Sequence, residues 1–158
     1  MVQKTLIFKI LILIIIFSNN NLYGKTIVGK AKIIDGDTIH IRENKIRLYG
    51  IDAPETNQEC LHNNKKWQCG KDSTNFLKKI THNRIVECKI NGVDKYKRYI
   101  GICFTNQKNL NKHIVKNGWA IAYRYYSKYY IDEELIAKKN KKGIWRGEFE
   151  EPYKFREK

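Results

Sequence analysis

Apolar and polar residues alternate through the first half of the chain in the way that is typical of strands. The stretch "TIVGKAKIIDGDTIHI" (26–41) alternates on both sides of Asp35-Gly36, a dipeptide that favours a hairpin turn. A further short turn leads into "ENKIRLYGI" (43–51). The pattern therefore predicts three consecutive strands joined by short turns, followed by a polar loop over residues 57–69.

The pattern then changes to the spacing of a helix. In "GKDSTNFLKKITHN" (70–83), Phe76, Leu77 and Ile80 form one apolar face, and Asp72 or Ser73 can cap the first turn. Two apolar runs follow, "RIVECKI" (84–90) and "RYIGICF" (98–104), which predict two strands joined by residues 91–97.

The last third of the chain predicts two more helices. "NLNKHIVKNG" (109–118) is closed by Gly118, and "WAIAYRYY" (119–126) is extended or partly irregular. "IDEELIAKKNKKG" (131–143) has acids in its first turn and lysines in its last, which matches the helix dipole, and we expect Gly143 to end it.

This order of elements predicts an α+β fold. Three strands, a helix, two strands and two helices suggest a five-stranded β-barrel of the OB-fold type with three α-helices. A chain of 158 residues has room for one such domain and not for two.

The N-terminal segment reads as a targeting sequence. An apolar run from Ile10 to Phe17 follows a lysine-bearing start, and it is far shorter than the roughly 20 residues that cross a bilayer. We expect residues 1–24 to be a signal peptide, with an uncleaved membrane anchor as the alternative, and residues 25–158 to form the domain. The protein is then secreted or periplasmic.

The chain is strongly basic. Its formal net charge is +15, and residues 25–158 keep +13 because the first 24 residues carry two lysines and no acid. A surplus of this size predicts a polyanionic partner, either nucleic acid or an anionic membrane surface. Biased base composition in a genome also enriches lysine, so the charge alone leaves the partner open.

Four cysteines occur at positions 60, 69, 88 and 103, all after the predicted signal peptide. In an exported protein an even number indicates disulfides, and four cysteines allow three pairings. Local pairing, Cys60 with Cys69 and Cys88 with Cys103, closes the shortest loops. A zinc site that uses the first pair and His62 is the alternative, although the spacing is wide for a metal knuckle.

Carboxylates gather at two places in this basic chain. Asp35 and Asp37 project to the same side of an extended segment, and Asp52 ends a strand next to the first hairpin. With the main-chain carbonyl of Ala53 they form a set of hard oxygen ligands that suits Ca²⁺, if water and a substrate phosphate complete the shell. The alternative for "DGD" is an ordinary turn.

Glu55 and two arginines add further chemistry. Pro54 restricts the backbone before Glu55, whose carboxylate could take a proton from an attacking water. The guanidinium groups of Arg47 and Arg98 can each hold two phosphate oxygens. Taken one at a time, a loop acid and two surface arginines are the alternatives.

Tyrosines and bases alternate in "AYRYYSKYY" (122–130). Interleaved rings and cations can stack nucleobases while they neutralise phosphates, although about half of these rings are expected to fill the core or the walls of a groove. The tyrosines are Tyr123, Tyr125, Tyr126, Tyr129 and Tyr130, and the bases are Arg124 and Lys128.

Together these motifs resemble the staphylococcal (micrococcal) nuclease, or thermonuclease, family. "IDGDT", "RLYGIDAPE", "DKYKR", "NKHIVKNGWA" and "KKGIW" occur in the family's order from about residue 30 to residue 145. The resemblance implies a five-stranded barrel with three helices. The loop "ETNQECLHNNKKWQCG" (55–70) resembles a cysteine-bearing branch of the family.

The resemblance also assigns expected roles. It implies one Ca²⁺ held by Asp37, Asp52 and the carbonyl of Ala53, with Asp35 acting through water. It implies Glu55 as general base, Arg47 and Arg98 as the clamp on the scissile phosphate, Lys95 and Tyr96 near a terminal phosphate, and Tyr123 and Tyr125 lining the nucleotide cleft. The family usually has threonine at Ala53 and glycine at Lys97, so we expect the turn at Lys97 to differ slightly.

The expected activity is a Ca²⁺-dependent, largely nonspecific endonuclease that cuts DNA and RNA to 3′-phosphate products, as a monomer without a stable protein partner. The alternative is a non-catalytic nucleic-acid-binding module of the OB type that kept the barrel and the basic cleft.

Overall fold

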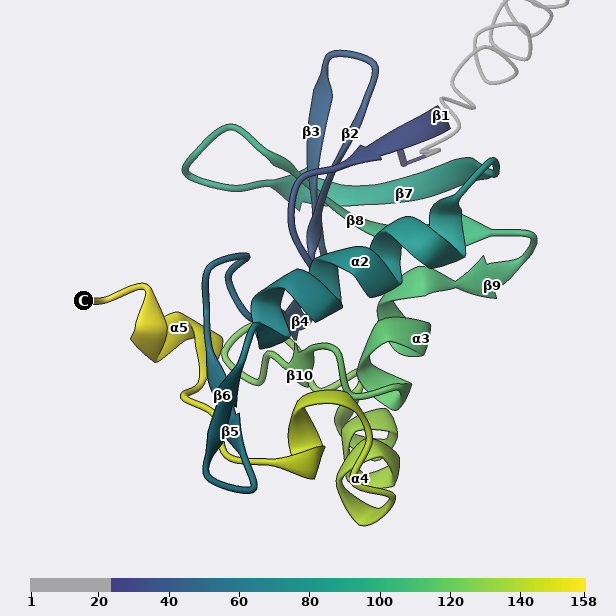
Figure 1. Ribbon diagram of the computed structural model, residues 1–158. Helices are drawn as coiled ribbons and strands as arrows, with labels where there is room; N and C mark the ends of the chain where they lie inside the picture. The colour runs from purple at the N-terminus through teal and green to yellow at the C-terminus, as the bar shows by residue number, and fades with distance from the viewer. Residues whose placement is uncertain (1–23) are drawn as a thin grey trace, which may run out of the picture.

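The computed structural model describes residues 24–158 (Figure 1). The predicted signal peptide or anchor therefore lies, except for its last residue, outside the described residues. No helix within 24–158 has the length and apolar character that a membrane span requires.

Five strands close into the predicted barrel. The antiparallel order is β3-β2-β1-β7-β8, and a parallel pairing of β3 with β8, in which Ile46 faces Tyr99, closes the ring. Alternate residues point inward and form the core, among them Ile39, Ile41 and Val86. The strands are β1 (Thr26–Ile33), β2 (Thr38–Ile41), β3 (Asn44–Leu48), β7 (Ile85–Val93) and β8 (Tyr99–Thr105).

The three predicted helices are present: α2 (Cys69–Thr81), α3 (Leu110–Lys116) and α4 (Ile131–Lys139). In Figure 1, α2 crosses the barrel, while α3 and α4 lie below it. The expected cap of α2 is wrong, since the helix begins at Cys69. Ser73 lies inside the helix, where it is buried and donates a hydrogen bond to the carbonyl of Trp119 (2.7 Å).

The predicted end of the last helix is also wrong. α4 ends at Lys139 with Asn140 as its cap, because Lys141 adopts a left-handed φ of 48° that interrupts the helix. Gly143 instead begins a short 3₁₀ helix, η1 (Gly143–Arg146).

The polar loop at 57–69 contains a small hairpin that the sequence pattern did not predict. β5 (Cys60–His62) pairs with β6 (Lys65–Trp67) across Asn63-Asn64, and both asparagines have positive φ, as tight hairpin turns require. The strands escaped prediction because each is only three residues long, too short to show an alternating pattern. The remaining short elements are β4 (Ile51–Asp52), β9 (Lys108–Asn109), β10 (Ile121–Ala122) and α5 (Pro152–Phe155).

Both disulfides join the cysteines that local pairing predicted. Cys88 and Cys103 face each other on β7 and β8 and cross-link two barrel strands. Cys60 and Cys69 connect the β5–β6 hairpin to the first residue of α2. Because Cys60 and Cys69 are bonded to each other, the zinc alternative is excluded.

Candidate active site

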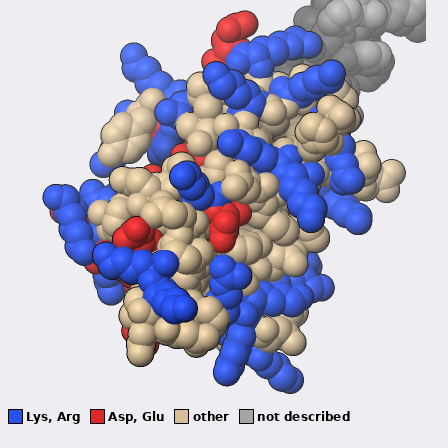
Figure 2. Space-filling model, in the orientation of Figure 1, with Lys and Arg blue, Asp and Glu red and all other residues tan. Residues whose placement is uncertain are grey.

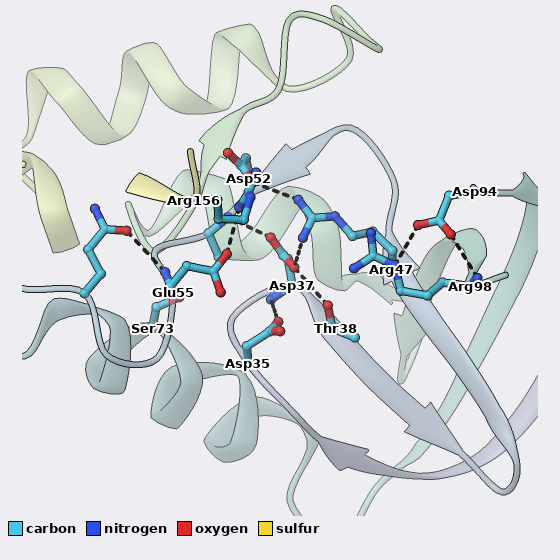
Figure 3. A network of polar contacts seen from close by, with 12 residues as sticks. Asp35, Asp37, Thr38, Arg47, Asp52, Glu55, Ser73, Asp94, Arg98 and Arg156 are labelled. Carbon is cyan, nitrogen blue, oxygen red and sulfur yellow. Dashed lines mark hydrogen bonds and ion pairs between the residues drawn. The ribbon is translucent and has the colours of Figure 1, made fainter. Parts of the chain in front are cut away.

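Two aspartates and an arginine meet where the first barrel strands end (Figure 3). Asp37 precedes β2, Arg47 lies in β3 and Asp52 ends β4. The Arg47 guanidinium donates from Nη1 to Asp37 Oδ1 and from Nη2 to Asp52 Oδ1 (2.7 Å). The side chains of Asp37 and Asp52 are 3% and 0% exposed, so one cation holds two buried carboxylates in a fixed arrangement.

The backbone around Gly36 makes this arrangement possible. A Cβ at Gly36 would lie 2.1 Å from Ser73 Oγ and 2.6 Å from Ala53 Cβ, so only glycine allows this loop to pack against α2 and the end of β4. The close approach lets the main-chain N–H of Ala53 donate to Asp37 Oδ2 (2.8 Å). Asp37 therefore links the ends of β2, β3 and β4.

Asp35 lies beside this group, with its Oδ1 accepting from the main-chain N–H of Asp37 (3.0 Å). Burial, and then the neighbouring charge of Asp37, raise the pKa of Asp35 to about 7. Burial and Asp37 also raise the pKa of Asp52, although Arg47 and Arg156 oppose that rise. Crowded carboxylates of this kind are stabilised by a cation.

The residues present fit a hard divalent cation. Asp52 Oδ2 is buried and has no hydrogen-bond partner among the described residues, which leaves a carboxylate oxygen free for a ligand. No group of three or more His, Cys, Asp or Glu side chains that could hold a metal is found within residues 24–158. Two carboxylates alone would leave most of the shell of such an ion to main-chain carbonyls, water and substrate oxygens.

Glu55 lies three residues after Asp52. Its main-chain N–H donates to Gln58 Oε1 (3.2 Å), and a Cβ at Gly70 would lie 1.7 Å from its carbonyl oxygen, so the first turn of α2 packs directly against it. The Glu55 carboxylate pairs with Arg156 Nη1 (2.8 Å), and Nη2 of the same guanidinium pairs with Asp52 Oδ1 (2.8 Å). Sequence reasoning missed Arg156, because a single arginine near the chain end belongs to no motif.

Arg98 lies on the other side of Arg47 and does not join the aspartate cluster. Its Nε donates to Asp94 Oδ2 (2.6 Å) at the turn between β7 and β8 (Figure 3). Arg47 and Arg98 nevertheless line one pocket of about 320 Å³, whose walls include the predicted substrate-binding residues Lys95, Tyr96 and Tyr123. Both arginines therefore open onto the same pocket.

The turn at Lys97 keeps a conformation that suits glycine. Lys97 has a φ of 61°, a left-handed value that costs a side-chain-bearing residue some strain. Glycine would adopt this value with less strain, and the expected difference from relatives that carry glycine here stays a prediction.

Tyrosines form an exposed group next to the pocket. The ring of Tyr125 is 81% exposed and lies 6.2 Å from that of Tyr123. Sequence reasoning missed Tyr153. This residue lies in α5, near the end of the chain, and the centre of its ring is 6.3 Å from that of Tyr123. Arg124 pairs with the buried carboxylate of Glu134 (2.5 Å).

Basic side chains cover much of the face shown in Figure 2, with few acidic groups between them. A surface of this kind attracts a polyanion over a distance set by the Debye length, about 8 to 10 Å at physiological salt. The acidic cluster described above is thus a local exception within a basic molecule.

Comparison with known proteins identifies relatives of this chain. Residues 45–147 match the family model described as "Staphylococcal nuclease homologue". The chain is 36% identical over 129 residues to the succinoglycan biosynthesis protein ExoI of Rhizobium meliloti, covering 79% of this chain and 68% of that protein. It is 31% identical over 144 residues to the micrococcal nuclease of Shigella flexneri, covering 80% and 78%. It is 33% identical to the endonuclease YhcR of Bacillus subtilis over 79% of this chain and 12% of that protein.

Proposed function

Because this chain belongs to the staphylococcal nuclease homologue family, we propose that it is a hydrolytic nuclease that cuts DNA and RNA at phosphodiester bonds with little sequence preference. The observation that supports this most directly is the cluster of Asp37, Arg47 and Asp52, with Glu55 beside it and a basic, tyrosine-lined pocket next to it. A protein that only bound nucleic acid would have no use for buried carboxylates at the phosphate site.

Arg47 and Arg98 bind the scissile phosphate. Both line the same pocket, and two guanidinium forks can donate to the phosphate oxygens on which charge builds up as water attacks. Arg47 is the more rigid of the two, because Asp37 and Asp52 hold both of its terminal nitrogens. The pair orients the phosphate before the reaction and stabilises the transition state during it.

Glu55 accepts the proton of the attacking water at its carboxylate. The 5′-oxygen leaves on the opposite side of the phosphorus, so the products end in a 3′-phosphate. Proton transfer of this kind contributes roughly 10² to 10⁴-fold to the rate of an enzyme.

The proposed cofactor is one Ca²⁺, held by Asp37, Asp52 and the main-chain carbonyl of Ala53, with Asp35 acting through water. When bound, the ion supplies positive charge beside the reacting phosphate. The chain's own residues form the site, because Arg47 keeps the two aspartates together and Asp52 Oδ2 has no hydrogen-bond partner among the described residues.

Lys95, Tyr96, Tyr123 and Tyr125 bind the rest of the substrate. Lys95 and Tyr96 lie on the turn between β7 and β8 at the pocket wall, where they suit a second phosphate. The exposed ring of Tyr125 can stack on the base of a deoxyribonucleotide or of a ribonucleotide, which agrees with activity on both DNA and RNA. We further propose that residues 1–24 direct export and that the domain acts as a monomer outside the cytoplasm, where its disulfides are stable.

The test compares wild-type protein with Glu55→Gln on plasmid DNA and on RNA, with added Ca²⁺ or with a chelator. We expect cutting that requires the ion and a fall in kcat of about 10² to 10⁴-fold in the variant. Glu43→Gln is the matched control, because Glu43 is an exposed carboxylate on the turn between β2 and β3. Cutting that ignores both the chelator and Glu55→Gln would refute the mechanism, and a wild type that binds nucleic acid without cutting would be a binding module.

A further inference from the structure

The segment after the family match folds back onto the active site. Residues 148–158, here called the C-terminal arm, begin beyond residue 147, where the match ends. Glu148 and Leu61 exchange two main-chain hydrogen bonds (2.7 and 2.8 Å), and Pro152 in α5 is buried. Figure 1 shows α5 beside the β5–β6 hairpin, so the arm packs against the disulfide-linked hairpin.

One buried side chain connects the arm to the loop that carries Glu55. Gln58 is 0% exposed, and its Nε2 donates to the carbonyl of Glu150 (2.7 Å). Its Oε1 accepts from the main-chain N–H of Glu55 (3.2 Å). The same amide therefore fixes the position of the arm relative to the backbone of Glu55.

The arm places Arg156 between two acids of the site. Nη1 donates to Glu55 Oε1 and Nη2 to Asp52 Oδ1, each at 2.8 Å. Among the residues described, no other hydrogen bond or ion pair involves the Glu55 carboxylate, whose side chain is 31% exposed. Without Arg156, several rotamers would be open to the Glu55 side chain, and its carboxylate would no longer be held beside Asp52.

Structural stabilisation alone does not account for this contact. Asp52 Oδ1 already accepts from Arg47, so a second guanidinium on the same oxygen is brought close to a like charge. An ion pair of a partly exposed glutamate contributes about 0 to 1 kcal/mol to stability. The Arg156–Asp52 pair stabilises a buried carboxylate, whereas the Arg156–Glu55 pair mainly sets the direction of the Glu55 carboxylate.

We propose that Arg156 is a positioning residue of the nuclease site, which holds the Glu55 carboxylate beside Asp52 in the orientation that receives the proton of the attacking water. This inference rests on the proposed function. Arg156 affects the reaction by orienting Glu55. The arm and the Cys60–Cys69 hairpin affect it by positioning Arg156.

The test measures kcat and KM of the full chain with Arg156→Ala and Arg156→Lys. We expect Arg156→Ala to lower kcat by about 10 to 100-fold, the range that misplacement of a reacting group produces, and to leave KM within about twofold. Arg156→Lys should give an intermediate kcat, because one ammonium cannot replace a fork that spans two carboxylates. Lys158→Ala is the matched control on the same arm, since within residues 24–158 Lys158 forms an ion pair with Glu150 alone, at the surface.

A double-mutant cycle separates positioning from loss of structure. If Arg156 acts through Glu55, Arg156→Ala should have no further effect on kcat in protein that already carries Glu55→Gln. Full additivity of the two effects, an unchanged kcat in Arg156→Ala, or an increased kcat would each overturn the proposal. An inactive wild type would instead refute the proposed function itself, and the two failures are thus distinct.

Discussion

The two sides of the cleft are built in opposite ways. On the carboxylate side, Asp37 and Asp52 are buried and Arg47 is half-buried, and each group is held by another. The tyrosine side presents rings on turns, with Tyr96 66% and Tyr125 81% exposed. The side to which we assign the chemistry is positioned by the ends of strands, whereas the side to which we assign substrate binding leaves its rings free to adapt.

This difference has a physical origin. Buried charges must be paired, so each member of the carboxylate side constrains the others, and loss of one leaves its partners uncompensated. An exposed ring has no such dependence, because water contacts it in the absence of substrate. We therefore expect substitutions on the carboxylate side to change both stability and rate, and substitutions on the tyrosine side to change binding alone.

The largest expected effect belongs to Arg47→Ala. Removal of the guanidinium leaves the buried Asp37 without its cationic partner and Asp52 with Arg156 alone, which should lower the free energy of unfolding by about 3 to 5 kcal/mol in the absence of a divalent cation. It also removes a donor to the scissile phosphate and should lower kcat by about 10² to 10³-fold. Urea unfolding with a chelator present, and initial rates of DNA cleavage with Ca²⁺, measure the two effects.

Arg98→Ala is the contrasting variant for that measurement. Arg98 pairs with Asp94 on a turn, so its loss should lower activity while the free energy of unfolding changes by about 1 kcal/mol or less. Equal destabilisation by Arg47→Ala and Arg98→Ala would contradict the expectation that stability depends on Arg47 and hardly on Arg98.

An intermediate effect is expected on the tyrosine side. Tyr125→Ala removes a stacking surface worth about 1 to 3 kcal/mol per base, so KM for single-stranded DNA should rise about tenfold or more. The melting temperature and kcat should stay close to those of the wild type. Tyr125→Phe, which keeps the ring, is the control, and a fall in kcat for Tyr125→Ala with unchanged KM would place this ring on the carboxylate side.

A further expected effect is a dependence of stability on pH. The pKa of Asp35 is about 7 in the folded protein, raised by burial and Asp37 from an ordinary value of 3.8. Between these two values the folded state keeps a proton that the unfolded state has lost, so this group lowers the free energy of unfolding as pH rises from about 4 to about 7.

Asp35→Asn removes that contribution. Urea unfolding from pH 4 to pH 8 with a chelator should show a shallower decline for the variant than for the wild type. Parallel curves would show that the Asp35 carboxylate titrates at its ordinary pKa, as an exposed turn residue would.

Much of the carboxylate side could be predicted from the sequence. Alternation places Arg47 in a strand, and the spacing of Asp35, Asp37 and Asp52 brings three acids to the ends of neighbouring strands. These predictions succeed because they depend on local periodicity and on short turns. The barrel itself follows from the order of five strands, and its closure between β3 and β8 agrees with that order.

The arm could not be predicted in this way. Arg156 reaches Glu55 only because Gln58, Leu61 and Glu148 fold the last residues onto the β5–β6 hairpin. That hairpin has no apolar alternation of its own and is held by a disulfide. Contacts between a polar loop and a distant chain end leave no periodic signal, so they become visible only in three dimensions.

Barrel closure has a consequence for the order of folding. β3 pairs with β8, and Asp52 on β4 pairs with Ile121 on β10, so the site depends on contacts between segments far apart in sequence. Contacts of this kind form late, because long loops must close before they are made. The lysines and arginines, in contrast, carry their charge in every conformation. We therefore expect a partly folded chain to bind nucleic acid already, and to gain the ability to cut it only when the barrel has closed.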